Sequence, residues 1–233
     1  MTLIDTAEMY GDGASERLVG EAFTGQRDQL FIVSKVLPQN AGGRRLQLSC
    51  EASLKRLGTD RIDLYLLHWP GSVPLADTVA GMEKLREAGK IRHWGVSNFD
   101  VDDMEDLLHA GGSRCAVNQV LYNLRRRGPE FSLMPYQEKR SMPLMAYSPV
   151  EQGRMPVTGR LAAVAARHGA SVMQVALAWV LRDPAVIAIP KAGNAAHVED
   201  NRKALDLALS EQDLAELAAQ FPPPARKTSL EML

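Results

Sequence analysis

Residues 30–67 read LFIVSKV, LPQNAGGRRLQLSCEASLKRLGTDR, IDLYLL, and this stretch decides the fold. Two short runs rich in Val, Ile and Leu, Leu30–Val36 and Ile62–Leu67, flank a longer segment. In that segment apolar residues recur at helical spacing, and Gly58 supplies a helix stop. Because the two runs hardly alternate with polar residues, we expect strands covered on both faces. Strands joined by a helix run parallel, since such a crossover needs a dozen or more residues.

The same strand–helix pattern repeats about seven times along the chain. The other apolar runs are Leu3–Ile4, Arg92–Val96, Ala116–Val120, Leu144–Tyr147 and Val186–Ile189. Helix starts are indicated at Asp100, at Ser171 with Gln174, and at Ser210 with Asp213. A parallel sheet of this length is either doubly wound or a closed barrel, and periodicity leaves both open. The glycine-rich turn of a doubly wound nucleotide fold is only partly matched by Gly11-Asp12-Gly13.

Composition places the chain among ordinary globular proteins. Hydrophobic residues make up 45% of the 233 residues and charged residues 24%, and the net charge is −1. This balance gives no reason to expect a nucleic-acid or membrane partner, and no apolar run reaches the ~20 residues of a membrane span. Cys50 and Cys115 lie among apolar residues without metal-ligand spacing. We therefore expect one domain, residues 1–233, in a reducing cytoplasmic setting.

Polar residues that interrupt or end the expected strands are the candidates for chemistry, because barrel active sites lie at the carboxyl ends of strands. They are Asp5, Lys35, His68, Asn98, Gln119 and Tyr147. A lysine inside a buried strand is costly unless it is paired. Asp5 and Lys35 could therefore form a purely structural ion pair, and His68 could be a core histidine. Taken singly, none of these residues specifies a function.

Taken together, they lie in blocks whose order and spacing resemble the aldo-keto reductase family. The blocks are 5–11 with 13–16, 33–36, 63–70, 95–99, 118–119, 146–149 and 189–191, read here as DTAEMYG with GASE, VSKV, DLYLLHWP, GVSNF, NQ, AYSP and IPK. Within the family, Gly71-Ser72, Gln152-Gly153 and His197-Val198 look most similar to the bacterial branch that includes methylglyoxal reductases. The resemblance implies a (β/α)8 TIM barrel. It also implies a monomeric enzyme that reduces aldehyde or ketone substrates with NADPH.

The resemblance assigns four catalytic residues and no metal. Tyr10 would be the general acid that protonates the carbonyl oxygen as hydride reaches the carbonyl carbon. Lys35 would make that donation easier by stabilising negative charge on the tyrosine oxygen, and Asp5 would hold Lys35 charged and aimed. His68 would orient the carbonyl by a hydrogen bond and, with Trp69, contact the substrate.

The resemblance also implies a cofactor site. The nicotinamide amide would be bound by Ser97, Asn98 and Gln119, and Tyr147 would stack on the nicotinamide ring. The pyrophosphate would be followed by Ser148, Pro149, Val150 and Gln152. The adenosine phosphate would meet Lys191, Ala192, Gly193 and Asn194, and the adenine would face Asp200 and Asn201. Many relatives have an arginine for the 2′-phosphate where this chain has His197, and a hydroxyl residue where it has Ala192. We therefore expect NADPH as the cofactor, with weaker binding of its 2′-phosphate than in those relatives, and NADH stays open as an alternative.

The chain begins inside the family pattern, directly before the family's second strand. The expected N-terminal hairpin, first strand and first helix, about 45 residues, are not in it. A seven-stranded barrel would have two unpaired edges, so we expect the 233-residue chain alone to be aggregated or molten and inactive. Two alternatives to a reductase stay open: a non-catalytic NADP(H)-binding protein, as in potassium-channel β subunits, or an inactive fragment. Another barrel enzyme, such as an isomerase, is disfavoured by Asn98, Gln119 and Tyr147.

Overall fold

The computed structural model describes residues 2–233, which form two compact units, Met1–Asn118 and Gln119–Leu233. The first unit contains β1 (Leu3–Asp5), α1 (Ala14–Ala22), η1 (Arg27–Gln29), β2 (Phe31–Val36), η2 (Pro38–Asn40), α2 (Gly43–Leu57), β3 (Ile62–Leu67), α3 (Leu75–Glu87), β4 (Ile91–Ser97) and α4 (Val101–His109). Its strands pair in parallel in chain order, with Asp5 opposite Val33 and Lys35 opposite Leu66. The predicted crossover geometry of residues 30–67 is confirmed.

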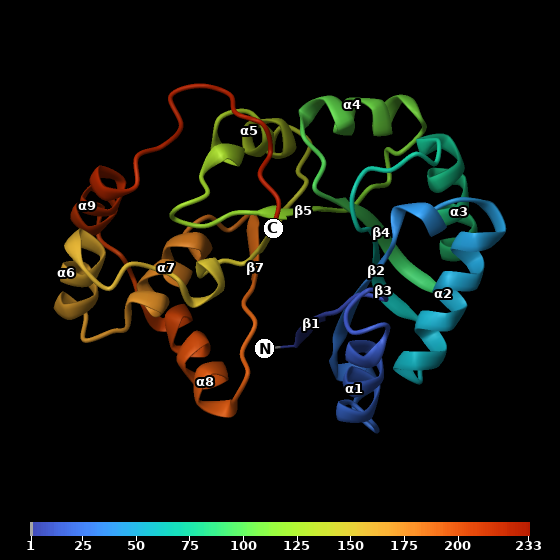
Figure 1. Ribbon diagram of the computed structural model, residues 1–233, viewed down its shortest axis with the longest axis horizontal. Coiled ribbons are helices and arrows are strands. Elements are labelled where there is room, and N and C mark those ends of the chain that lie inside the picture. The colour runs from blue at the N-terminus through green and yellow to red at the C-terminus, as the bar shows by residue number, and fades with distance from the viewer. Residues whose placement is uncertain (1) are drawn as a thin grey trace. The chain divides into compact units, whose positions relative to one another are not determined.

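Helices cover the strands of the first unit in sequence. Helix α2 packs against α1 on one side and α3 on the other, and α3 contacts β4 (Figure 1). Strand β3 is buried along its whole length, as the run without polar alternation predicted. The largest fully buried side chains between strands and helices include Tyr65, Trp94, Leu46 and Met82. This core holds the carboxyl ends of β1 to β3 rigidly in register.

The second unit carries the rest of the chain: β5 (Asn118–Leu121, whose first residue belongs to the first unit), η3 (Gly128–Glu130), α5 (Leu133–Glu138), β6 (Leu144–Tyr147), η4 (Glu151–Gly153), α6 (Gly159–Arg167), α7 (Val172–Leu181), β7 (Val186–Ile189), α8 (Ala195–Lys203), η5 (Ala204–Asp206) and α9 (Glu211–Gln220). Strands β6 and β7 are parallel, with Tyr147 opposite Ile189. Helix α7 packs on β7, and α6 packs against both α7 and α9. Residues 222–233 contain no helix or strand.

Local signals located most elements correctly. Three strands have the predicted ends, and the other four differ by one to two residues at either end. Gly58 ends α2 in the left-handed conformation, at φ 62°, as a helix stop should. Reciprocal capping boxes start α4 at Asp100, α7 at Ser171 and α9 at Ser210. Helices α5 and α6 and the 3-10 turns were not predicted.

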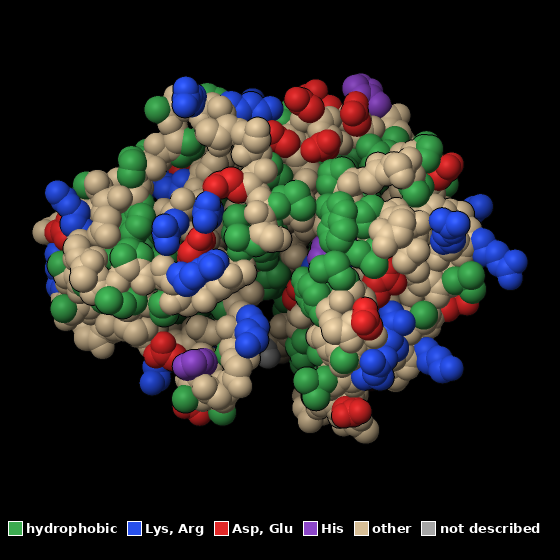
Figure 2. Space-filling model, viewed as in Figure 1, with side chains coloured by type: hydrophobic (Ala, Val, Ile, Leu, Met, Phe, Trp, Pro, Cys, Tyr) green, Lys and Arg blue, Asp and Glu red, His purple; other side chains and the backbone are tan. Residues whose placement is uncertain are grey.

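The surface mixes charges of both signs. Figure 2 shows lysine and arginine side chains interspersed with acidic ones, while acidic side chains gather over α4. Cys50 and Cys115 are buried and unpaired with each other. No single helix within residues 2–233 is long and apolar enough to cross a membrane, although α6 and α7, bent by 91°, meet that test of length and composition as a pair.

Candidate active site

A tight turn after β1 carries Tyr10. The backbone N–H of Thr6 still bonds to β2, at Val33 O, before the chain leaves the sheet. Residues 11–13 then take left-handed backbone angles, with φ of 58°, 51° and 79°. Glycine suits two of these positions, and at Gly13 a Cβ would lie 2.4 Å from Arg56 Cδ. The turn therefore leads directly into α1, and Tyr10 is left partly exposed beside the end of β2.

The centre of the site is the ammonium of Lys35, which is fully buried on β2. Its Nζ donates to Asp5 Oδ1 at 2.5 Å, to the carbonyl of Thr6 at 2.9 Å and to Tyr10 Oη at 3.3 Å. Three acceptors satisfy the three donors of an ammonium, so the buried charge is compensated. The Asp5–Lys35 ion pair predicted from the sequence is confirmed. The same geometry places the positive Lys35 Nζ within 3.3 Å of the Tyr10 hydroxyl oxygen.

His68 follows β3 and lies beside Tyr10. The ring centroids of Tyr10 and His68 are 5.7 Å apart, with an interplanar angle of 76°. The ring centroid of Trp69 lies 4.8 Å from that of His68. Burial, followed by the charge of Lys35, lowers the pKa of His68 to about 3. The imidazole is therefore neutral near pH 7. Its buried Nδ1 has no hydrogen-bond partner within residues 2–233.

Two glutamates that had no role predicted from the sequence, half-buried Glu8 and buried Glu16, position this site. Glu8 Oε1 accepts from the backbone N–H of Leu37 and from Asn40, which ties the Tyr10 turn to the end of β2. Glu16 accepts from Ser34 Oγ at 2.5 Å and from Arg56 Nε at 2.6 Å. Both glutamates stand in the quoted 5–16 block, but their partners are 18 to 40 residues away. Sequence spacing alone could not assign these contacts.

Ser97 and Asn98 end β4 in the same unit as the catalytic four. Asn98 has φ 62°, and its side chain donates to Ser97 Oγ and to the carbonyl of His68, both at 3.1 Å. Asn118 bonds both backbone groups of Phe99, which fixes the turn after β4. The structure thus brings Ser97 and Asn98 together with the backbone of His68. No role was predicted for Asn118 from the sequence, and its bonds to Phe99 show that it fixes the turn after β4.

The other expected cofactor residues lie in the second unit. Gln119 is on β5 and bonds Met145 of β6, and half-buried Tyr147 ends β6. After Tyr147 the chain turns sharply, because Ser148, Glu151 and Gln152 all have positive φ, near 50°. Such angles are uncommon for residues other than glycine and tend to mark functional loops. Pro149 is buried in this loop, and Val150 is half-buried.

The segment 191–201, expected from the sequence to meet the adenosine part of the cofactor, leads into and forms most of α8. Lys191 is exposed before α8, and Asn194 caps the helix by accepting from the His197 N–H. Acidic and basic residues both occur on α8, at Glu199, Asp200, Arg202 and Lys203. Ala192 is half-buried, and Gly193, His197 and the first turn of α8 are exposed. Because Asn194 already accepts from the His197 N–H, the first-turn N–H groups that could donate to a ligand there are those of Ala195 and Ala196.

Asp200 makes structural contacts in addition to the adenine contact expected from the sequence. Its carboxylate accepts from Ser171 Oγ at 3.1 Å and from Gln174 Nε2 at 2.8 Å. These bonds tie α8 to the N-terminus of α7, and Asn201 is half-buried beside it. Within the described residues no group of three or more His, Cys, Asp or Glu side chains could hold a metal.

Comparison with known proteins agrees with this geometry. Residues 1–220 match the Aldo/keto reductase family. The chain belongs to that family, and its fold is the family's (β/α)8 barrel. Methylglyoxal reductase YeaE of Escherichia coli is 52% identical over all of this chain and 84% of its own length. Glyoxal reductase of Bacillus subtilis is 38% identical over 93% of this chain and 77% of its own.

Solved structures give the same result. A Klebsiella pneumoniae aldo/keto reductase in complex with NADP and acetate superposes with a TM-score of 0.98 at 49% identity, covering 100% of this chain and 84% of that one. The thermostable reductase Tm1743, in complex with the inhibitor epalrestat, has a TM-score of 0.89 at 41% identity, covering 93% and 81%.

The depressed pKa of His68 predicts a pH-dependent stability term. Between about pH 6.5 and pH 3 the unfolded chain binds a proton at this residue and the folded chain does not, so stability is lost as pH falls through that window. Relative to His68→Gln, the unmodified protein should lose about 3 kcal/mol of unfolding free energy between pH 7 and pH 4. Urea unfolding at both pH values measures this. A difference between the two proteins that does not change with pH would contradict the prediction.

Proposed function

We propose that this reductase reduces small aldehydes and ketones, with methylglyoxal and related dicarbonyls as the leading substrate class, and takes its hydride from NADPH. One observation carries the chemistry: the buried Lys35 ammonium contacts both the Asp5 carboxylate and the Tyr10 hydroxyl. The names of the relatives support the substrate class, since two of them are a methylglyoxal and a glyoxal reductase. NADPH supplies the hydride when it is bound.

Tyr10 then supplies the proton. As the carbonyl oxygen gains negative charge, the Tyr10 hydroxyl donates to it and becomes a phenolate beside Lys35 Nζ, 3.3 Å away. The ammonium stabilises that phenolate, and Asp5 keeps the ammonium fixed and charged. No side chain has to move to provide this stabilisation, because the bonds of Lys35 already hold it in place. Preorganised charge of this kind is commonly the largest electrostatic contribution to catalysis.

His68 is suited to orient the substrate rather than to protonate it. A neutral imidazole with a pKa of about 3 is a poor source of protons near pH 7 but a competent hydrogen-bond donor. The ring stands beside both Tyr10 and Trp69, so a carbonyl held by Tyr10 also lies within reach of His68. This division of labour leaves Tyr10 as the single proton donor.

The residues expected around NADPH fit that ligand chemically. Ser97, Asn98 and Gln119 carry side chains that can bond a carboxamide, and Tyr147 offers a ring face. Left-handed angles at Ser148 and at residues 151–153 turn the loop after β6, which would follow the pyrophosphate. Lys191 offers positive charge to an adenosine phosphate, His197 a ring nitrogen, and the start of α8 the N–H groups of Ala195 and Ala196. Asp200 and Asn201 would flank the adenine.

We further propose a cytoplasmic monomer. Two buried free cysteines are at home in a reducing compartment, and the expected active site draws all its catalytic residues from one chain. A non-catalytic NADP(H)-binding role would not need Asp5, Tyr10, Lys35 and His68 in working contact, and that contact favours the enzyme. Native mass measurement distinguishes a monomer from a larger assembly.

Tyr10→Phe should lower turnover by several orders of magnitude and leave NADPH affinity nearly unchanged. The substitution removes the proton donor but retains the ring against His68, and the expected cofactor contacts lie elsewhere. Methylglyoxal and 4-nitrobenzaldehyde reduction, followed by NADPH absorbance, and cofactor titration by fluorescence measure the two effects. If the variant reduced either substrate at a rate near that of the unmodified protein, Tyr10 would not be the acid.

His197→Arg should tighten NADPH binding by about three- to ten-fold, because a guanidinium bonds phosphate bidentately from an exposed site. NADH affinity should change little, since NADH lacks the 2′-phosphate. His93→Arg is the matched control, because it adds the same charge at an exposed position on β4. Equal gains for both cofactors, or for both variants, would mean that position 197 does not meet the 2′-phosphate.

A further inference from the structure

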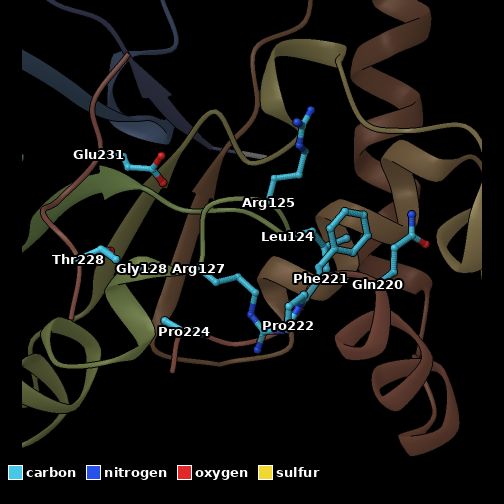
Figure 3. Close-up of a pocket in the computed structure, with 10 residues that line it drawn as sticks. All are labelled: Leu124, Arg125, Arg127, Gly128, Gln220, Phe221, Pro222, Pro224, Thr228 and Glu231. Carbon is cyan, nitrogen blue, oxygen red and sulfur yellow. The ribbon is translucent and has the colours of Figure 1, made fainter. Parts of the chain in front are cut away.

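A cavity of about 360 Å³ in the second unit lies between the turn after β5 and the end of α9 with the chain that follows it (Figure 3). The two arginines that line it already donate to other groups of the protein. Arg127 donates to Glu130 and to the carbonyl of Phe221. Arg125 donates to the carbonyl of Arg154. In the first unit, by contrast, an arginine outside the catalytic four is bonded to the segment that carries the proposed acid.

That arginine is Arg56, in the last turn of α2, which lies against the turn that carries Tyr10. A Cβ at Gly13 would lie 2.4 Å from Arg56 Cδ and 2.6 Å from its Nε, so the arginine stem packs directly on the glycine backbone. Gly13 has φ 79° and immediately precedes α1. Arg56 therefore covers the start of α1, close in sequence to Tyr10.

The guanidinium of Arg56 also anchors α1 through a buried carboxylate. Its Nε donates to Glu16 Oε2 at 2.6 Å, and the Glu16 side chain is fully buried. The other carboxylate oxygen accepts from Ser34 Oγ on β2 at 2.5 Å. Arg56 Nη2 bonds Ser53 of the same helix at 3.1 Å, which fixes the orientation of the guanidinium. Because a buried carboxylate without its cationic partner is costly, the position of α1 on β2 depends on Arg56.

The start of α1 in turn holds the backbone of Tyr10. The N–H of Ser15 donates to the carbonyl of Tyr10 at 3.2 Å, and Ser15 Oγ accepts from Thr6 Oγ1 at 2.9 Å. The carbonyl of Thr6 is one of the three acceptors of Lys35 Nζ. A shift of α1 away from β2 would therefore move both Tyr10 and Thr6 relative to the buried ammonium.

We propose that Arg56 is a positioning residue for proton donation, which holds α1 against β2 so that the Tyr10 hydroxyl stays beside Lys35 Nζ. The inference rests on the proposed function, which makes Tyr10 the acid. Arg56 bonds α1 and α2, whereas the residues expected around NADPH lie on other elements. Its loss should therefore slow the chemical step and leave cofactor affinity nearly unchanged.

The test is single-turnover hydride transfer to methylglyoxal by protein preloaded with NADPH, followed by cofactor absorbance in H2O and in D2O. Arg56→Met keeps the stem and removes the charge, and it should slow this step by about 10- to 100-fold, the scale of a displacement of up to ~1 Å. The solvent isotope effect should rise, because transfer of the tyrosine proton becomes harder. The Kd for NADPH, from fluorescence titration, should change little. Arg56→Lys should recover part of the rate, since an ammonium still compensates Glu16.

Arg27→Met is the matched control, because Arg27 also pairs with a fully buried carboxylate of the first unit, that of Asp63, at 2.7 Å. Asp63 lies near the start of β3, and His68 follows the other end of that strand. Arg27→Met should lower the midpoint of thermal unfolding at least as much as Arg56→Met, because Arg27 makes further hydrogen bonds to Thr59 and to two backbone carbonyls. It should leave the single-turnover rate and the isotope effect unchanged.

An unchanged rate in Arg56→Met, or equal slowing in Arg27→Met, would overturn the proposal. A slower rate with an unchanged isotope effect and no recovery in Arg56→Lys would do the same. If Arg56→Met does not fold, Arg56→Lys is compared with the unmodified protein, and an unaltered rate and isotope effect would then count against the proposal. Full activity of Tyr10→Phe would instead refute the proposed function, so the two failures are distinguishable.

Discussion

The buried ammonium of Lys35 is the constraint on which the rest of the first unit depends. A charge in the middle of a fully covered strand is unstable unless its donors are satisfied, and the chain satisfies them from a single neighbouring segment. Asp5, Thr6 and Tyr10 all follow within six residues of one another, at the end of β1 and in the turn after it. The β1–β2 register, with Asp5 opposite Val33, sets this segment beside Lys35. The contacts that compensate the buried Lys35 charge are therefore the same ones that place the ammonium beside the Tyr10 hydroxyl.

That arrangement requires a precise turn, and much of the surrounding polar structure serves it. The turn is tied at one end by Glu8 to Leu37 and Asn40, and at the other by Glu16 to Arg56. Glu16 also accepts from Ser34, the residue before Lys35. The same carboxylate therefore links the helix after the Tyr10 turn to the strand that carries Lys35. Both carboxylate oxygens of buried Glu16 accept hydrogen bonds, which limits the desolvation cost of burying it. The Tyr10 oxygen is held relative to Lys35 by this network as well as by direct contact.

The sequence predicted those parts of the molecule whose causes are local. Strand runs, the Gly58 stop and the capping boxes depend on residues within a few positions, and they lie where expected. The Asp5–Lys35 pair was predicted because an unpaired buried lysine is so costly. Contacts across long separations were not: Arg126 to Glu151 spans 25 residues, and nothing in the composition of either segment specifies the other. The left-handed angles at Ser148, Glu151 and Gln152 were equally hidden, since these residue types give no turn signal of the kind glycine gives.

These two parts of the molecule use buried charge in different ways. Around Lys35 the partners belong to strands and to a turn bound to them, so the charge distribution is fixed before any ligand arrives. Around Glu151 the compensation is shared by Arg126 and Asn123, and Arg126 also contacts an exposed glutamate in an irregular segment. Rigid compensation suits proton donation, because the stabilising charge must already be in place when the carbonyl oxygen becomes negative. At Glu151 the hydrogen bonds from Arg126 and Asn123 instead stabilise the left-handed backbone after β6, because a buried carboxylate without them would be costly there.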